Sequence, residues 1–202
     1  MTTLALNMVV AHEARRLRHT LPLLRTLVDE LVIVDSGSVD GTELVSQPYA
    51  DTYVWVRSSP RFCEGQRNIA RKVTTSDWIL ILDADELPTE WLRNNLRKLI
   101  DDPEASAYYL RRENLLDGQP HPVAHYENHM RLCRREDLFH EENVHTDPSC
   151  LSKERIKQVD ELCIYHHKTW EEQHYDDERY RTSTQLPVDY KWWQLTKNLA
   201  VR

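Results

Sequence analysis

The most constraining feature of this chain is a short apolar run, Trp78-Ile79-Leu80-Ile81-Leu82, which ends in Asp83-Ala84-Asp85-Glu86. An apolar run without alternating polar positions is typical of a strand buried on both faces inside a mostly parallel sheet. In open α/β sheets, the residues after such a strand enter the crevice at its carboxyl end, where ligands bind. The sequence therefore predicts a crevice lined by acidic side chains at residues 83–86.

Asp83 and Asp85 are separated by one small residue, Ala84. In an extended chain, residues two apart point to the same side, so both carboxylates would face one ion. Carboxylates beside a phosphate-sized opening suit Mg²⁺ or Mn²⁺, which take phosphate oxygens and water as further ligands. The alternative is a solvated acidic turn that caps the next helix.

The first hundred residues alternate between strand-like and helix-like segments. Strands are expected at residues 3–10, 30–34, 52–56 and 78–82. Helices are expected between them, and another is expected after Pro88 and Thr89. This alternation favours crossover connections and a largely parallel sheet.

The first expected helix carries an apolar stripe at helical spacing, formed by Leu17, Leu21, Leu24 and Val28. Pro22 interrupts this stripe. It predicts either a kink or a helix that begins near Thr20, with the proline in its first turn.

The second half is less regular. Residues 105–110 and 129–134 read as further strands, and the stretch from about residue 170 is highly charged and aromatic. That last stretch would be a helix packed on the domain or an ordered lid. We expect three parts: residues 1–100, residues 101–169 of the same domain, and a C-terminal segment at 170–202.

The composition sets limits on location and partners. The 202 residues carry a formal charge of −7, which gives no general attraction to nucleic acid or anionic membranes. No apolar stretch approaches the roughly 18 residues of a membrane span, and Leu4–Val10 is too short for a signal peptide. The 4 scattered cysteines favour reduced thiols. We expect a cytoplasmic protein, with the basic residues Arg131, Arg134 and Arg135 as a weak contact to the inner membrane face.

Three polar segments fall at expected strand ends or at an adjacent helix start, so one crevice would gather them. They are Asp35-Ser36-Gly37-Ser38-Val39-Asp40-Gly41-Thr42, Gln66-Arg67-Asn68, and residues 83–86. In this order and spacing they resemble the signatures of family 2 nucleotide-sugar glycosyltransferases. The run Trp78–Glu86 is similar to the "W-x-L-x-L-D-A-D-E" of the lipopolysaccharide-core β-glucosyltransferase branch. The resemblance is strong over residues 3–100.

This resemblance implies a GT-A type α/β fold: a Rossmann-like, mostly parallel sheet flanked by helices, with a smaller mixed region on the acceptor side. It also implies inverting transfer from a nucleotide-diphosphate sugar, with a UDP-sugar favoured, assisted by Mn²⁺ or Mg²⁺. The implied donor contacts are Ala11, Glu13, Asp35, Arg67 and Asp83, and the implied metal ligands are Asp85 and Asp83.

An inverting displacement needs a general base that deprotonates the acceptor hydroxyl. The related branch carries a "V-H-E" segment after a strand similar to residues 130–135, whereas this chain has Val144-His145-Thr146-Asp147. In order of preference, the candidate bases are Glu142, Asp147 and Glu141.

A second histidine feature is Ile164-Tyr165-His166-His167. Members of the family often have a histidine near the metal and diphosphate, so the resemblance implies such a role for His166 or His167. The alternative is that one of them hydrogen-bonds a loop carbonyl.

Two other functions remain open. A nucleotidyltransferase or nucleotide-sugar hydrolase would use the same ion, but no Gly-rich basic loop follows the first strand. A degenerate, non-catalytic nucleotide- or glycan-binding protein is favoured by the threonine after His145. The acceptor hydroxyl is equally open: a glycan, a lipid-linked sugar or a protein side chain would serve, and a nucleic-acid acceptor is disfavoured.

Overall fold

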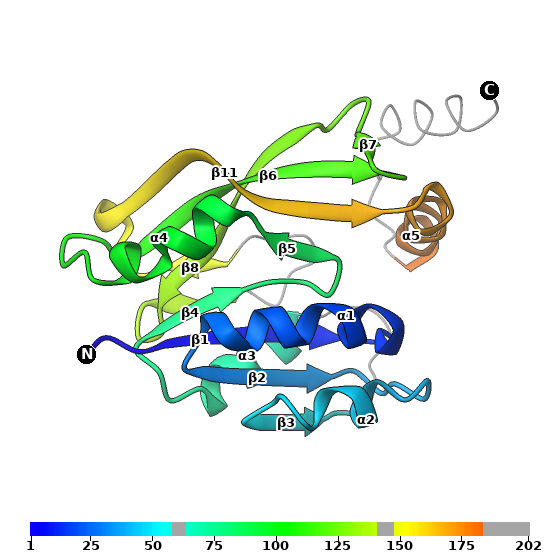
Figure 1. Ribbon diagram of the computed structural model, residues 1–202, viewed down its shortest axis with the longest axis horizontal. Coiled ribbons are helices and arrows are strands. Elements are labelled where there is room, and N and C mark those ends of the chain that lie inside the picture. Colours follow the sequence, from blue (N-terminus) through cyan, green and yellow to red (C-terminus); the bar gives the residue numbers. More distant parts are fainter. Residues whose placement is uncertain (58–63, 141–147, 184–202) are drawn as a thin grey trace.

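The computed structural model describes residues 1–57, 64–140 and 148–183 (Figure 1). Its strands are β1 Leu4–Val10, β2 Glu30–Asp35, β3 Thr52–Trp55, β4 Trp78–Ile81, β5 Glu86–Pro88, β6 Ala107–Leu116, β7 Gln119–Pro120, β8 Tyr126–Arg134, β9 Leu138–Phe139, β10 Ser149–Cys150 and β11 Ile156–Lys168. Its helices are α1 Ala14–Leu24, α2 Thr42–Ser46, α3 Glu64–Val73, α4 Glu90–Ile100 and α5 Trp170–Ser183, with 3₁₀ turns at Arg25–Leu27 and Lys153–Arg155.

One large sheet runs through the molecule in the order β3-β2-β1-β4-β8-β6-β11-β5. The strands β3, β2, β1 and β4 are parallel, as the alternation of the first hundred residues predicts. The other part is mixed: β8 is antiparallel to β4 and β6, β11 is parallel to β6, and β5 is antiparallel to β11. The expected combination of a parallel first half and a mixed second half is confirmed.

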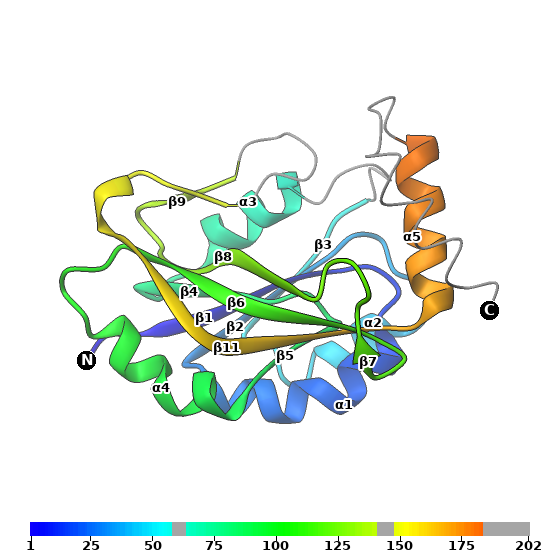
Figure 2. The same ribbon diagram turned by 90° about the horizontal axis from the view of Figure 1, so that it is seen from above.

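Helices cover both faces of the sheet (Figure 2). α1 and α4 lie on one face, and α3 lies on the other. Alternate residues of β2 show the division, since Leu31 and Ile33 join the core beneath α1, whereas Val32 and Val34 pack against Ala70 of α3. The central strands are therefore buried on both faces.

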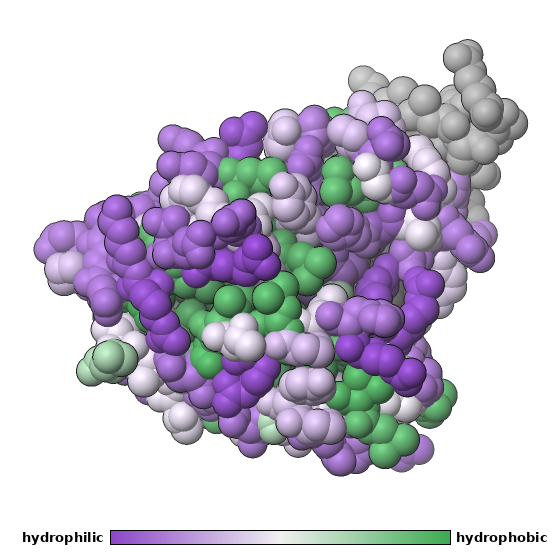
Figure 3. All heavy atoms as spheres, viewed as in Figure 1, coloured by the Kyte–Doolittle hydropathy of each residue, from purple (hydrophilic) through white to green (hydrophobic). Residues whose placement is uncertain are grey.

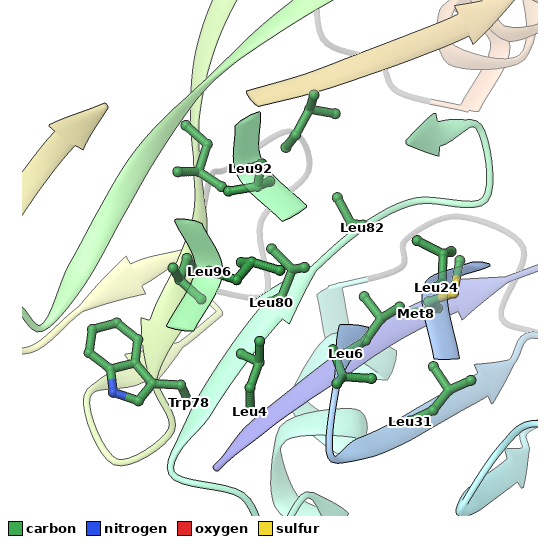
Figure 4. Close-up of a cluster of buried hydrophobic side chains, with 14 of the residues drawn as sticks. Leu4, Leu6, Met8, Leu24, Leu31, Trp78, Leu80, Leu82, Leu92 and Leu96 are labelled. Atoms are coloured by element: carbon green, nitrogen blue, oxygen red, sulfur yellow. The ribbon is translucent and has the colours of Figure 1, made fainter. Parts of the chain in front are cut away.

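The main core forms where β1, β4, α1 and α4 meet (Figure 4). The apolar run of residues 78–82 supplies Trp78, Leu80 and Leu82, each fully buried. Full burial of one such leucine side chain contributes roughly 2 kcal/mol. The same run contributes Ile79 and Ile81 to a second cluster on the opposite face, which explains its unbroken apolar character.

The sequence supports two expectations for the helix around Pro22, and the structure contradicts the one that starts the helix near Thr20. α1 begins at Ala14, six residues before Thr20, so the alternative start near Thr20 is wrong. Pro22 lies inside α1, and the chain continues directly into the 3₁₀ turn at Arg25–Leu27. The apolar stripe stabilises the helix on both sides of Pro22, because Leu17, Leu21 and Leu24 are all fully buried.

The segment from Trp170 forms a helix, α5, at the edge of the sheet where β1, β2 and β11 end (Figure 1). Its start is a reciprocal cap: Glu172 N donates to Thr169 Oγ1 at 3.1 Å, and Thr169 N donates to Glu172 Oε2 at 2.9 Å. The same Glu172 carboxylate lies 2.6 Å from Arg16 Nη2 of α1. This ion pair joins α5 to α1.

In the described part of the chain, no helix is both long and apolar enough to cross a membrane. Cys133, Cys150 and Cys163 are buried free thiols, and Cys63 lies outside the described residues. The face shown in Figure 3 is largely hydrophilic, with apolar side chains gathered in places, including the region of α2 and β3. Exposed apolar residues there include Val39, Leu44 and Trp55.

Asp29, just before β2, joins the start of β1 to α4. Its carboxylate accepts from Leu4 N at 2.8 Å and from both terminal nitrogens of Arg97, at 2.7 and 3.0 Å. The hydrogen bond from Arg97 lowers the pKa of Asp29, against a smaller opposing effect of burial.

We expect Asp29→Asn to destabilise the protein at pH 7 by about 0.2–1 kcal/mol, the usual range for an exposed ion pair. Because the folded pKa is lowered, this stabilisation is present above the unfolded pKa of about 3.9 and is lost as the pH falls through the folded value. Urea unfolding at pH 7, 4 and 3 would measure it, with Glu104→Gln as an exposed control. A difference from wild type that stays constant across this range would contradict the assignment.

Candidate functional site

The strand order places the candidate site. β1 lies between β2 and β4, and the chain reaches β2 and β4 from opposite faces of the sheet, so a topological switch point falls between β1 and β4. Ligands of open α/β sheets bind at the carboxyl ends of strands at such a point. The polar segments after β1, β2 and β4 meet there.

The loop after β2 holds the loop after β1. Three consecutive backbone amides, of residues 12, 13 and 14, donate to Ser38 Oγ, Thr42 Oγ1 and Asp40 Oδ2 at 2.8, 2.9 and 3.1 Å. These amides precede or open α1, whose first N–H groups have no partner inside the helix. The signature segment 35–42 therefore builds the base of the crevice by capping its neighbour, a role beyond the turn formation that its composition indicates.

Asp35 ends β2 and is fully buried. Its Oδ1 accepts from Ser38 N at 2.8 Å, and its Oδ2 accepts from the Tyr53 hydroxyl. Burial, together with the bond to Asp35, raises the pKa of Tyr53, so this phenol stays protonated as the donor. The expected donor contact of Asp35 stays a prediction, and its carboxylate already orders the loop that follows.

Residues 83–86 form a closed turn. Glu86 N donates to Asp83 O at 3.0 Å, and Asp83 N donates back to the Glu86 side-chain Oε2 at 3.0 Å. The extended geometry expected for this segment is therefore wrong. The turn directs Asp83 and Asp85 to different partners.

Asp83 is held by two arginines. Its Oδ1 lies 2.8 Å from Arg67 Nη2 of α3, and its Oδ2 lies 3.1 Å from Arg131 Nη2 of β8. Burial alone would raise the pKa of Asp83, but the charges of Arg67 and Arg131 outweigh it and hold this pKa far below its usual range. Asp83 is thus an ionised carboxylate that fixes a guanidinium at the crevice.

Glu86 is fully buried and joins two arginines. Its Oε1 lies 2.6 Å from Arg131 Nη2 and 2.7 Å from Arg112 Nη1. Arg112 in turn contacts Glu127 Oε2 at 2.6 Å. A continuous set of ion pairs therefore runs from Arg67 through the turn to Glu127.

The basic residues 131, 134 and 135 do not form one exposed cluster, which corrects the expectation of a membrane contact built on them. Arg131 is only 5% exposed, because it pairs with the acidic turn. The Arg134 guanidinium lies over the Trp78 ring, 4.9 Å from its centroid. Arg135 Nε donates to the Ser76 carbonyl at 3.0 Å.

Asp85 faces His166 of β11. Its Oδ2 lies 3.2 Å from His166 Nε2, and its backbone carbonyl accepts from His167 N at 2.8 Å. Burial alone would raise the pKa of Asp85, but the hydrogen bond and charge of His166, and the charge of Lys168, lower it overall. Of the two candidate histidines, His166 presents its ring to Asp85, and His167 contributes its backbone.

The residues at Asp85 fit a divalent cation. Among the described residues, no group of three or more His, Cys, Asp or Glu side chains is arranged around one ion. Mg²⁺ and Mn²⁺ in phosphate-handling sites need only one or two protein ligands, because phosphate and water complete the shell. Asp85 and His166 offer an ionised oxygen and a ring nitrogen that converge, whereas Asp83 is committed to its arginines.

Ala11 and Glu13 lie where the expectation places them, in the loop after β1. Ala11 is exposed. The Glu13 carboxylate lies 3.1 Å from Arg16 Nη1, and burial raises its pKa despite this opposing contact. Arg16 also contacts Glu172, so α5 lies next to this side of the crevice.

The three candidate bases, Glu141, Glu142 and Asp147, lie outside the described residues. The structure does show how their segment begins. Asn68 of α3 donates to the His140 carbonyl at 2.9 Å and accepts from His140 N at 3.1 Å. Burial, with the charges of nearby arginines, lowers the pKa of His140 to about 3, so its ring is neutral. Within the Gln66-Arg67-Asn68 motif, Arg67 thus contacts the acidic turn and Asn68 contacts the backbone of residue 140.

Sequence reasoning missed Arg112, Asn114 and Glu127, which the fold brings to the acidic turn. Arg112 and Asn114 continue the face of β6 on which Tyr108 and Leu110 are buried. The sequence of β6 did contain a signal for this network. Its inward positions change from apolar to polar toward the carboxyl end of the strand, and buried polar residues of this kind need hydrogen-bonding partners.

The model for glycosyl transferase family 2 matches residues 8–154. The chain belongs to this family. Its curated relatives include an uncharacterized glycosyltransferase of Rickettsia bellii, 26% identical over 132 residues, which cover 61% of this chain and 43% of the relative. A TPR repeat-containing protein of Synechococcus elongatus is 35% identical over 119 residues, which cover 59% and 29%.

The lipopolysaccharide core biosynthesis glycosyltransferase LpsC of Rhizobium meliloti is 38% identical over 74 residues, covering 35% of this chain and 27% of LpsC. The chain spans less than half the length of these relatives. Among solved structures, S. aureus TarS 1–349 in complex with UDP-GlcNAc has a TM-score of 0.63 at 14% identity, and the match covers 83% of this chain and 59% of the TarS 1–349 chain. This likeness confirms the GT-A type fold.

We expect Asp40→Ala to loosen the loop after β1, because the Ala14 amide and the Thr42 amide and hydroxyl all lose their acceptor. The loss should be about 1 kcal/mol, as for other N-terminal caps. Thermal unfolding and amide hydrogen exchange at residues 12–14 would measure it. Glu43→Ala, at an exposed position of α2, is the control, and equal exchange in both variants would refute the capping role.

We expect Glu86→Gln to destabilise the fold by about 3–5 kcal/mol, the cost of leaving buried charges without their partner. The matched control is Glu90→Gln, an exposed glutamate in the first turn of α4. Urea unfolding would compare them. A loss for Glu86→Gln no larger than that of the control would show that Arg112 and Arg131 are satisfied without this carboxylate.

Proposed function

We propose that this protein is a metal-dependent, inverting glycosyltransferase that moves a sugar from a nucleotide-diphosphate donor, with a UDP-sugar favoured, to an acceptor hydroxyl. The observation that carries the proposal is the pairing of Asp85 with His166 beside the Arg67–Asp83 pair at the switch point of the sheet. This arrangement combines an ionised ligand for a cation with a guanidinium for phosphate.

Membership in glycosyl transferase family 2 supports the reaction class. TarS, which shares the fold, has been solved with UDP-GlcNAc, and this supports a uridine nucleotide as donor. LpsC, a lipopolysaccharide core glycosyltransferase, supports a glycan acceptor. In this proposal, residues 1–100 bind the donor, residues 101–169 bind the acceptor, and the segment from 170 borders the donor crevice.

The chemistry requires that negative charge on the departing diphosphate be neutralised. Arg67 is proposed to contact that diphosphate, with its guanidinium oriented by Asp83. Asp35 is proposed to contact the base or ribose; because its carboxylate is fully buried and bonded to Ser38 N in this structure, that contact requires the loop at Ser38 to move. Glu13 and the backbone at Ala11 are proposed to border the nucleoside.

Asp85 and His166 are proposed to hold Mn²⁺ or Mg²⁺. A divalent cation bound there supplies electrostatic stabilisation of the leaving diphosphate. The acceptor hydroxyl loses its proton to a carboxylate, for which Glu142, Asp147 and Glu141 are proposed in that order.

The first test is ligand-dependent thermal unfolding with UDP alone, Mn²⁺ alone and both together. A ligand that binds only the folded state raises the melting temperature, and we expect the largest rise with both, because cation and diphosphate share contacts. Asp85→Ala should remove the metal-dependent part of the shift. Glu90→Gln is the control for a lost surface carboxylate. No shift with any nucleotide would overturn the proposal.

Turnover separates the proposed enzyme from a non-catalytic binding protein of the same fold. Release of UDP from UDP-sugars should be measurable and should fall at least about a hundredfold in the variant that lacks the base, the usual contribution of such catalysis. The variants Glu142→Gln, Asp147→Asn and Glu141→Gln would identify it. Binding of UDP and Mn²⁺ without turnover of any sugar nucleotide would favour the non-catalytic alternative.

A further inference from the structure

Arg16 of α1 is shared between two carboxylates from opposite ends of the described chain. Its Nη1 lies 3.1 Å from Glu13 Oε2, and its Nη2 lies 2.6 Å from Glu172 Oε2. The exposed fraction of the side chain is 23% for Arg16, 22% for Glu13 and 29% for Glu172, so water screens these contacts only in part. This triad of Glu13, Arg16 and Glu172 joins the loop after β1 to α5.

The α5 end of the triad is firmly placed. β11 stays paired with β6 up to Lys168, and Thr169 follows directly. Thr169 N donates to Glu172 Oε2 at 2.9 Å, and this is the same oxygen that faces Arg16. The position of Glu172 is therefore set by the end of a paired strand and by a capping bond.

The other end of the triad lies at the crevice. The backbone N of Glu13 donates to Thr42 Oγ1 at 2.9 Å, which fixes the main chain there. Burial raises the pKa of Glu13, the contact with Arg16 opposes this, and the charge of nearby Asp85 adds to the rise. Like charges repel, so a Glu13 carboxylate without Arg16 would turn away from Asp85 toward water.

Arg16 and Glu13 alone would make a weak contact. They are three residues apart, and such pairs contribute little on an isolated helix. Glu172 supplies a second partner from a different element, and this partner restricts the guanidinium. A side chain that is ordered before a ligand arrives lowers the entropic cost of binding.

We propose that Arg16, anchored by Glu172, is a positioning residue that holds the Glu13 carboxylate in the crevice, so that α5 forms part of the donor site. The proposal rests on the proposed function, in which Glu13 borders the nucleoside. It assigns to the charged C-terminal helix a role in donor binding.

The protein without ligand gives the first test. Nitrogen-15 relaxation of the arginine Nε–H groups reports how strongly each guanidinium is ordered. We expect an ordered Arg16 in the wild type and a mobile one in Glu172→Gln. Glutamine also closes a capping box, so α5 should persist in this variant. A mobile Arg16 in the wild type, or equal order in both proteins, would overturn the proposal.

Affinity for UDP gives the second test. Calorimetric titration with UDP in the presence of Mn²⁺ measures the dissociation constant separately from the fraction of protein that binds. Arg16→Gln and Glu172→Gln should each weaken UDP binding about 3- to 10-fold, as for the loss of one hydrogen-bonded contact. Arg16→Lys keeps the charge but not the fork that reaches both carboxylates, so it should lose affinity too. A purely structural role would lower the binding fraction and leave the dissociation constant unchanged.

A double-mutant cycle tests whether Glu172 acts through Glu13. If it does, Glu13→Gln and Glu172→Gln together should weaken binding by less than the product of their separate effects. The control is Arg15→Gln. Arg15 also approaches Glu172, at 3.6 Å, but its side chain is 82% exposed, so its loss should leave UDP affinity unchanged. Separate effects that multiply in full would refute action through Glu13.

The two proposals fail in different ways. A wild type with an ordered Arg16 that binds neither UDP nor Mn²⁺ would refute the proposed function alone. A wild type that binds UDP, with affinity unchanged in both Arg16→Gln and Glu172→Gln, would refute the positioning role alone.

Discussion

The buried carboxylate of Glu86 is the contact on which the geometry of the site depends. It accepts from the Asp83 backbone and pairs with Arg112 and Arg131, so one side chain closes the turn and anchors two strands to it. A buried charge of this kind is tolerated only when its partners are in place. The acidic turn and the strands β6 and β8 are therefore expected to form together, and not as separate units.

The same contacts form a path between the two carboxylates of the turn. From Asp83 it leads through Arg131, Glu86, Arg112 and Glu127, and from there through Asn114 and His166 to Asp85. Asp83 and Asp85 are two residues apart in sequence, yet their orientations are set from opposite ends of this network. Pre-organised polar networks of this kind reduce the reorganisation needed when charge develops in a site.

Most of the first half of the fold was predictable from sequence because its signals are local. A continuous apolar run specifies β4, a stripe of leucines specifies α1, and capping residues specify the loop after β2. The strand β5 was less accessible, because it has only three residues and is defined by its pairing with β11 from the second half of the chain. Arg131 was misread as a surface residue, since nothing near it in sequence shows that Asp83 and Glu86 lie beside it.

The two hydrogen bonds between the Asn68 side chain and the His140 backbone bear on how freely the sequence can vary at this position. Asn68 recognises only main-chain atoms of residue 140, and any amino acid except proline supplies both of them. These two hydrogen bonds to residue 140 thus do not depend on which side chain that residue carries. The hydrogen bonds at residue 140 therefore tolerate any residue there that has a backbone N–H.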